Sequence, residues 1–62
     1  MIYKNHTITS TARGYEISTV QNGRTIYLET LYRSTAKWTT DYTYSRRYTS
    51  IESAKKAIDR II

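Results

Sequence analysis

The chain contains no cysteine, proline or phenylalanine, and it has only two glycines and a single histidine. The absence of Cys excludes disulfides and thiolate metal ligands, and one His cannot by itself build a zinc site. The carboxylates are dispersed, and none stand at the spacing of a calcium-binding loop or a metalloprotease motif. We therefore expect neither a metal nor another cofactor.

Long apolar runs are also missing. No stretch approaches the roughly 20 apolar residues that span a bilayer, and the N-terminus lacks the basic and apolar regions of a signal peptide. Together with the lack of Cys, these features predict a cytoplasmic protein that makes no membrane contact.

Acidic residues are scarce, since five Asp and Glu stand against ten Lys and Arg. The net charge is +5 and the pI is near 9.8. A positive field of this density favours polyanionic partners such as nucleic acid, acidic protein surfaces or anionic lipid. The same charge also serves solubility, so it does not by itself decide between these partners.

Groups suited to catalysis are few. His6 is the only side chain that titrates near neutrality without special help, and it lies among Thr and Ser residues of an early predicted strand. Nucleophilic catalysis would require it to act as a base beside a hydroxyl, whereas a hydrogen-bonded or exposed strand His needs no such arrangement. We expect the second role, and we expect that the protein is not an enzyme.

A chain of 62 residues forms one domain, which we assign to residues 1–62. At this size folding buries only about 60% of the unfolded surface, so stability is expected to be marginal. We expect additional stability to come from one of three sources: homodimerisation, a partner, or the packing of seven Tyr and one Trp. We expect about half of the Tyr to be structural, with Trp38 and Tyr48 among the core aromatics.

Two turns set the register of the predicted strands. Asn22-Gly23 favours a two-residue hairpin turn, because both central positions of that turn need φ > 0. A second turn at Arg13-Gly14 would pair Ser10 with Ile17 and Ile8 with Thr19. The first turn predicts the pairs Val20–Thr25, Thr19–Ile26, Ile17–Leu28 and Tyr15–Thr30. Both turns bury the same face, which contains Ile8, Ala12, Tyr15, Ile17, Thr19, Ile26 and Leu28.

Apolar residues recur at spacings of three and four over residues 51–62 and predict an amphipathic helix. Thr49 is the expected N-cap, with Glu52 completing a capping box and also pairing with Lys56. The apolar stripe consists of Ile51, Ala54, Ala57, Ile58, Ile61 and Ile62. The fold class is therefore α+β, with a three- or four-stranded antiparallel sheet packed against one C-terminal helix.

The stretch from residue 31 to 48 admits two interpretations. In the one that we favour, Leu31 and Tyr32 end a strand, residues 33–36 form a loop, Trp38 begins a short strand, and Asp41 caps a helical turn over residues 42–46. The alternative is one continuous strand over residues 37–44, because Thr and Tyr are common in strands.

The register from Asn22-Gly23 also places Glu16 opposite Glu29 on the face away from the core. Like charges at that separation destabilise a sheet, so we expect compensation. A cation such as Arg13 or Arg33 lying across the pair would provide it as a surface network. Alternatively, the two carboxylates would bind a partner molecule that is basic or donates hydrogen bonds.

Basic and aromatic residues alternate before the helix and suggest a binding surface. Arginine guanidinium groups make bidentate contacts with phosphates, and exposed Tyr rings provide stacking platforms for unpaired bases or anchors for protein partners. The candidate contact residues are Arg24, Tyr27, Arg33, Lys37, Tyr44, Arg46 and Arg47. Lys55 and Lys56 follow one helical turn later.

The order Trp38-Thr39-x-Asp41, Ser45-Arg46-x-Tyr48 and Ser50-x-Glu52-x-Ala54 resembles a pattern of small bacteriophage and mobile-element proteins. That pattern reads W-T-x-D, A-R-x-F and S-x-E-x-A, so Ser45 and Tyr48 replace its Ala and Phe. The order of strands, turn and helix is also similar to the N-terminal arm-binding domain of tyrosine recombinases, whose sheet enters the DNA major groove. Arg24 and the Tyr48-x-Ser50-x-Glu52-x-Ala54 run carry this second resemblance.

Two functions of different class follow from these residues and resemblances. The first is a non-enzymatic, phage-type basic module that binds nucleic acid or a nucleoprotein complex in the cytoplasm of a host cell. The alternative is a phage-encoded inhibitor that docks on a host defence protein such as a CRISPR effector, with its tyrosines as anchors.

Overall fold

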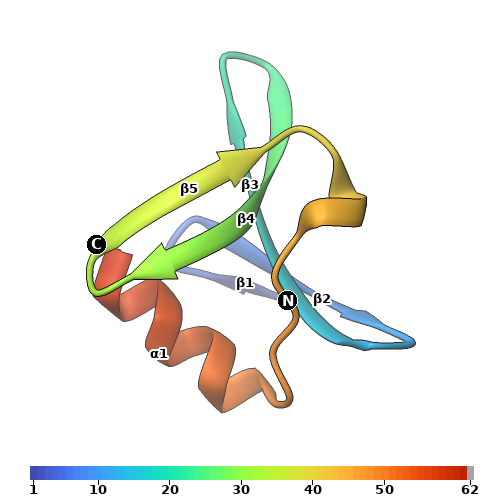
Figure 1. Ribbon diagram of the computed structural model, residues 1–62, viewed down its shortest axis with the longest axis vertical. Coiled ribbons are helices and arrows are strands. Elements are labelled where there is room, and N and C mark those ends of the chain that lie inside the picture. Colours follow the sequence, from blue (N-terminus) through green and yellow to red (C-terminus); the bar gives the residue numbers. More distant parts are fainter. Residues whose placement is uncertain (62) are drawn as a thin grey trace.

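The computed structural model describes residues 1–61 and contains one antiparallel sheet and one C-terminal helix (Figure 1). Each strand pairs with the next one in the sequence, in the order β1-β2-β3-β4-β5. The predicted α+β class is confirmed, but the sheet has five strands rather than three or four. The elements are β1 (Ile2–Tyr3), β2 (His6–Thr11), β3 (Gly14–Gln21), β4 (Arg24–Tyr32), β5 (Thr35–Thr39), the 3-10 turn η1 (Tyr42–Tyr44) and α1 (Ile51–Ile61).

The additional strand comes from a hairpin at the N-terminus. Its turn is Lys4-Asn5, and both residues have positive φ, of 49° and 65°. Asn tolerates this conformation, but Lys gives no such signal, and the turn contains no Gly. Mutual backbone hydrogen bonds between Met1 and Ile8, of 2.8 and 2.7 Å, extend the pairing beyond β1.

The hairpin at Asn22-Gly23 forms as predicted, with φ of 53° and 76° at its two central residues. Val20 pairs with Thr25 as expected, but the ladder between β3 and β4 ends at Ser18 and Tyr27. The two strands then diverge, and the chain over residues 45–48 descends between them (Figure 1). The predicted pairs Ile17–Leu28, Tyr15–Thr30 and Glu16–Glu29 are therefore wrong.

Backbone hydrogen bonds hold this inserted segment on both sides. Arg46 N donates to Leu28 O at 2.7 Å, and Tyr48 exchanges two hydrogen bonds of 2.8 Å with Tyr15. Three backbone groups that β3 and β4 would have offered each other, Leu28 O and both groups of Tyr15, are thus satisfied by this segment.

Gly14 allows the close approach of that segment. A Cβ atom at this position would lie 2.4 Å from Tyr48 O, and the φ of Gly14 is +131°. The β2–β3 turn is accordingly centred on Ala12-Arg13 instead of Arg13-Gly14, with Ile8 opposite Ile17. This shift of two residues preserves the buried face, because side chains alternate with a period of two. Ala12 nevertheless lies exposed in the turn, against prediction.

The core lies between the sheet and α1. Ile17, Leu28 and Ile58 are completely buried, as predicted, and small helix residues let α1 approach the strands. Ile61 is only partly buried at the end of the helix, and the predicted contribution of Ile62 falls outside the described residues. The buried cluster consists of Ile8, Ile17, Leu28, Ala54, Ala57 and Ile58. Tyr3, Tyr15, Tyr48 and Trp38 pack against it, which confirms that part of the Tyr set is structural.

Both ends of α1 are fixed by side chains. Ser50 is the N-cap, one residue later than the predicted Thr49, and its Oγ accepts a hydrogen bond of 3.1 Å from Ser53 N. Near the C-terminal end, Asp59 accepts hydrogen bonds from Tyr3 Oη at 2.9 Å and Lys4 Nζ at 2.6 Å. The contact with Lys4 is the main reason that the pKa of Asp59 lies below its usual value. These contacts join the helix to the first hairpin.

The capped turn predicted after Trp38 is confirmed, although it is shorter than residues 42–46. Asp41 Oδ1 accepts hydrogen bonds from Thr43 Oγ1 at 2.7 Å and Thr43 N at 2.9 Å. Both bonds favour the charged carboxylate and lower the pKa of Asp41. The preceding loop is also shorter than residues 33–36, because Thr35 and Ala36 already belong to β5.

The sheet is strongly curved. His6 on β2 stacks on Trp38 of β5 with ring centroids 5.9 Å apart, although these strands are not neighbours in the sheet. His6 Nδ1 also lies 2.8 Å from Lys4 O, which agrees with the expected hydrogen-bonded strand His.

Within residues 1–61 no helix has the length and apolar character needed to cross a bilayer.

We predict that Ile58→Ala lowers the free energy of unfolding by about 2–5 kcal/mol, because a large buried side chain is lost at the helix–sheet contact. Urea denaturation measures the change. Ile2→Ala is the matched control, since Ile2 is 76% exposed and its replacement should change stability by less than about 0.5 kcal/mol. Similar effects of the two substitutions would contradict the helix packing described above.

The two glycines provide a second comparison. Gly14→Ala should cost about 2–6 kcal/mol, because backbone strain and a steric clash with Tyr48 O add together. A Cβ atom at Gly23 would meet no atom within 4 Å. Gly23→Ala should therefore lower stability only by the backbone strain of an Ala at positive φ, about 1–2 kcal/mol. Thermal unfolding of both variants tests this order, and a reversed order would exclude the close approach at Gly14.

Candidate functional site

Residues 45–48 alternate between two sides of the molecule, as in a strand. Ser45 and Arg47 face Glu16 on the outer side of β3, whereas Arg46 and Tyr48 line a groove beside α1. The two adjacent arginines, which the sequence placed on one binding surface, therefore have different surroundings.

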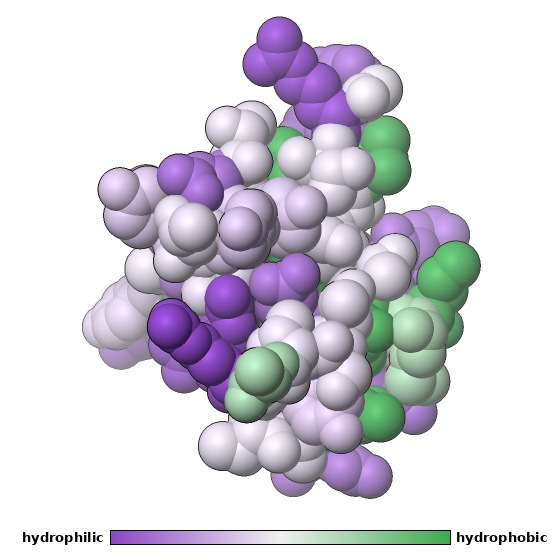
Figure 2. Space-filling model, turned by 90° about the vertical axis from the view of Figure 1, so that its right-hand side faces the viewer, coloured by the Kyte–Doolittle hydropathy of each residue, from purple (hydrophilic) through white to green (hydrophobic). Residues whose placement is uncertain are grey.

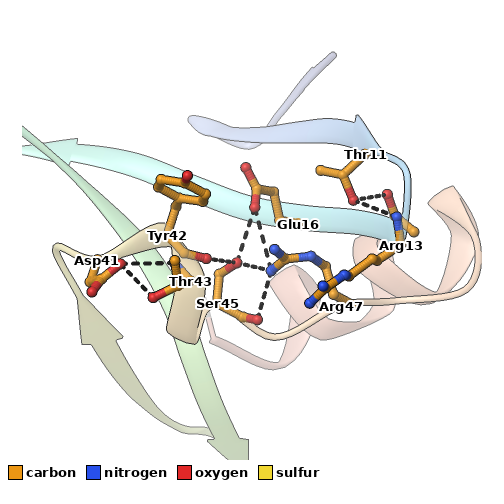
Figure 3. A network of polar contacts seen from close by, with 9 residues as sticks. Thr11, Arg13, Glu16, Asp41, Tyr42, Thr43, Ser45 and Arg47 are labelled. Atoms are coloured by element: carbon orange, nitrogen blue, oxygen red, sulfur yellow. Dashed lines mark hydrogen bonds and ion pairs between the residues drawn. The ribbon is translucent and has the colours of Figure 1, made fainter.

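On the outer side, Glu16 lies at the centre of a buried polar network (Figure 3). Its Oε2 accepts a 3.0 Å hydrogen bond from Ser45 Oγ and lies 3.5 Å from Arg47 Nη1. Arg47 Nη1 also donates to Ser45 O at 2.7 Å and contacts Ser45 Oγ. Arg47 thus neutralises a buried carboxylate and holds the inserted segment against β3.

Glu29 has a separate partner, because Lys37 Nζ lies 3.3 Å from its Oε2. The expected repulsion between Glu16 and Glu29 is avoided in two ways: β3 and β4 diverge at this level, and each carboxylate has its own cation. Neither Arg13 nor Arg33 forms an ion pair with these carboxylates in the described part of the chain.

A hollow of about 360 Å³ adjoins the Glu16 network and is lined by Thr11, Ala12, Arg13, Tyr42, Thr43 and Arg47. Figure 2 shows this side of the molecule as largely hydrophilic, with apolar surface mainly toward the right-hand edge. Several of its polar groups have partners within the protein, although Arg47 Nε is buried and has none among the described residues. Thr11 Oγ1 donates to Gly14 O, Thr43 Oγ1 donates to Asp41, and Arg47 is paired with Glu16.

The groove on the other side lies between β4, the inserted segment and α1, and its volume is about 180 Å³. We call it the cationic groove, and it is lined by Leu31, Arg46, Tyr48, Ser53, Lys56, Ala57 and Arg60. Three of these residues are cations and none is acidic. Within residues 1–61 the ion pairs are Lys4–Asp59, Lys37–Glu29 and Arg47–Glu16, so none of the groove cations is paired.

The positions of these cations follow from the local structure. Lys56 and Arg60 are four residues apart on α1 and therefore occupy the same helix face. Arg46 comes from the inserted segment and lies over the Tyr48 ring, with Cζ 5.1 Å from the ring centroid. The predicted Glu52–Lys56 pair does not form within the described residues, which leaves Lys56 free to face the groove.

Tyr48 contributes an unusual polar group to the cationic groove. Its hydroxyl is buried and has no hydrogen-bond partner among residues 1–61. A buried polar group without a partner costs about 1–3 kcal/mol relative to a hydrated one. Ser53 supplies a second hydroxyl, whose oxygen accepts a 3.0 Å hydrogen bond from Ser50 Oγ.

Of the predicted contact residues, the structure brings only Arg46 to the cationic groove. Arg24 lies at the tip of the β3–β4 hairpin, and Arg33 at the β4–β5 turn stacks over Tyr32. Tyr27 packs edge-to-face against Tyr42, and Tyr44 is exposed on η1. The remaining two, Lys37 and Arg47, are held by Glu29 and Glu16 as described above.

Sequence reasoning missed Arg60 and the hydroxyls of Tyr48 and Ser53 as site residues. The spacing of Lys56 and Arg60 was a usable signal, because residues four apart share a helix face. Lys55, which stood beside Lys56 in the sequence pattern, lies instead over the Tyr3 ring at 5.3 Å.

No match was found when the chain was compared with known protein families, curated proteins and solved structures. Within residues 1–61 no three His, Asp or Glu side chains gather as a metal site would require. The cationic groove is therefore the candidate site for a function.

The adjacent arginines should respond differently to substitution. Arg47→Gln leaves the buried Glu16 carboxylate without its cation and should cost about 1–3 kcal/mol of stability. Arg46→Gln removes an exposed, unpaired charge and should change stability by less than about 0.5 kcal/mol. Urea denaturation at neutral pH compares the two variants.

A double variant separates the ion pair from simple loss of side-chain packing. Glu16→Gln combined with Arg47→Gln should recover part of the stability lost in Arg47→Gln, because no uncompensated charge remains. Equal stabilities of the Arg46 and Arg47 variants would contradict the assignment of Arg47 to the buried network.

Proposed function

We propose that the protein is a small, non-enzymatic basic module that binds nucleic acid, alone or within a nucleoprotein complex, through contacts with phosphate. The observation that carries this proposal is the convergence of Arg46, Lys56 and Arg60 on one groove that no carboxylate of residues 1–61 lines. The resemblance to small phage and mobile-element proteins suits this function and the alternative below equally, and we place the protein in the cytoplasm of a host cell.

Electrostatics favours an anion in the cationic groove. Three like charges around a small volume repel one another, and a bound anion removes this repulsion. Arginine forms bidentate hydrogen bonds with phosphate oxygens, and lysine adds a compact positive charge. The net charge of +5 raises the rate at which a polyanion encounters this surface.

Other exposed residues provide additional contacts in this proposal. Arg24 and Arg33 lie at turns where they can reach a backbone phosphate, and Tyr27 and Tyr44 offer rings for base stacking. Lys37 adds a phosphate contact in this proposal, for which the phosphate competes with Glu29. We assign Arg47 to the buried network and not to the contact surface, because its guanidinium is held by Glu16 and Ser45.

The second candidate function is inhibition of a host defence protein such as a CRISPR effector. It is favoured by three strongly exposed tyrosines, since Tyr32, Tyr42 and Tyr44 are 72%, 61% and 66% exposed. Exposed Tyr rings are common anchors of protein interfaces, because they bring a rigid contact area and a hydroxyl group.

Salt dependence of binding tests the first function. We predict that the protein binds DNA or RNA oligonucleotides with an affinity that falls steeply as salt rises. Arg60→Ala and Arg46→Ala should each lower the slope of log K against log salt by about one unit. Fluorescence anisotropy over a salt series measures this slope.

Lys55→Ala is the matched control for this experiment, because it removes one positive charge from the same helix outside the cationic groove. It should lower the slope by less than the groove variants do. Absence of oligonucleotide binding would exclude the first function. If a host protein then bound, with Tyr32→Ala and Tyr44→Ala weakening it more than the Arg variants, the second function would be supported.

A further inference from the structure

We infer that the cationic groove accepts a terminal phosphate of a nucleic-acid strand, a phosphate monoester, in preference to the diesters along the backbone. This inference rests on the proposed function and specifies the ligand of the same site. Three features of the groove support it: its charge, its size and its free hydroxyls.

The charge of the groove matches a monoester better than a diester. A backbone diester carries a single negative charge, whereas a monoester carries about −1.5 to −2 near pH 7. Arg46, Lys56 and Arg60 together present three positive charges, and among the described residues no carboxylate lines the groove. A dianion therefore neutralises more of the repulsion between these cations than a monoanion does.

The size of the groove also favours a single phosphate group. Sites for complete small molecules occupy about 300–1,000 Å³, whereas this groove measures about 180 Å³. It is therefore smaller than a typical site for a whole nucleotide but large enough for a tetrahedral oxyanion. Leu31 and Ala57 provide apolar walls on the same groove. In this arrangement the sugar and base of the terminal nucleotide lie outside.

The hydroxyls supply hydrogen bonds that a monoester can accept. The Tyr48 hydroxyl has no partner in the part of the chain that the structure describes. Ser53 Oγ accepts from Ser50, which leaves the Ser53 hydroxyl hydrogen for a ligand. A monoester offers three terminal oxygens and so can accept from the cations and from a hydroxyl together. Because the Tyr48 hydroxyl is buried, contact with it requires movement of a neighbour.

The test compares oligonucleotides of identical sequence that carry a 5′-phosphate, a 3′-phosphate or no terminal phosphate. We expect one phosphorylated form to bind at least about tenfold more tightly than the unphosphorylated form. The preference should shrink as the pH falls through about 6, where the dianionic monoester takes up a proton and becomes a monoanion. The 5′ and 3′ forms identify which end of the strand is recognised.

Tyr48→Phe separates recognition from structure. It removes a hydroxyl that has no partner, so the melting temperature should stay the same or rise, while the preference for the terminal phosphate should fall several-fold. Tyr32→Phe is the matched control, because Tyr32 lies outside the groove, and it should change neither quantity. A fall in melting temperature with an unchanged preference would show that the hydroxyl is structural.

The failures of the two proposals are distinguishable. If all three oligonucleotides bind equally well with a steep salt dependence, the terminal-phosphate inference is overturned and the proposed function stands. If none binds, both are overturned. Binding of a phosphoserine peptide without binding of any oligonucleotide would retain the monoester chemistry but overturn the inference that the ligand is a nucleic-acid end.

Discussion

The backbone hydrogen bonds between Tyr15 and Tyr48 are the contact on which the rest of the molecule depends. They join the start of β3 to the segment that leads into α1, and Gly14 permits them because it has no Cβ. Once Tyr48 is fixed there, the helix starts three residues later and lies across the sheet. The same contact keeps β3 and β4 apart and so creates two different surfaces, one on each side of residues 45–48.

These two surfaces differ in their charge balance. On the outer side, Arg47 and the buried Glu16 neutralise each other, and Ser45 satisfies part of the carboxylate's hydrogen bonding. On the helix side, the Arg46 charge is added to those of Lys56 and Arg60 without a carboxylate. The attraction between the charges of a buried ion pair offsets their desolvation only when hydrogen bonds such as these accompany it. Such a pair leaves no charge available for a ligand. The helix side, where positive charge is in excess, is therefore the one suited to binding an anion.

The parts of the fold that were predicted from sequence are those determined by nearby residues. The Asn22-Gly23 turn, the apolar stripe of the C-terminal helix and the Asp41 cap each depend on residues within a few positions of one another. The buried residues Ile17, Leu28 and Ile58 followed from these local signals. The Lys4-Asn5 turn escaped prediction because neither Gly nor an Asn-Gly pair marks it.

The candidate site was only partly predictable, because it depends on contacts between distant residues. Extending the β3–β4 ladder beyond Ser18 was the simplest inference from the turn, and nothing local indicates that residues 45–48 replace it. That insertion sends Arg46 and Arg47 to opposite sides, so their adjacency in sequence was misleading. Arg46, one of the predicted contact residues, lies in the groove, whereas Arg60 and the Tyr48 hydroxyl become part of it only through tertiary packing.

The inserted segment also has a consequence for the order of folding. The β3–β4 hairpin can close early, because its turn is short and its pairs are local. The gap below Ser18 and Tyr27 stays open until residues far along the chain arrive. The contact of Tyr15 with Tyr48 spans about half of the chain, and that of Lys4 with Asp59 spans most of it. Loop-closure entropy opposes such contacts until they form together. Assembly of the groove thus belongs to the slow, cooperative step that completes the native state.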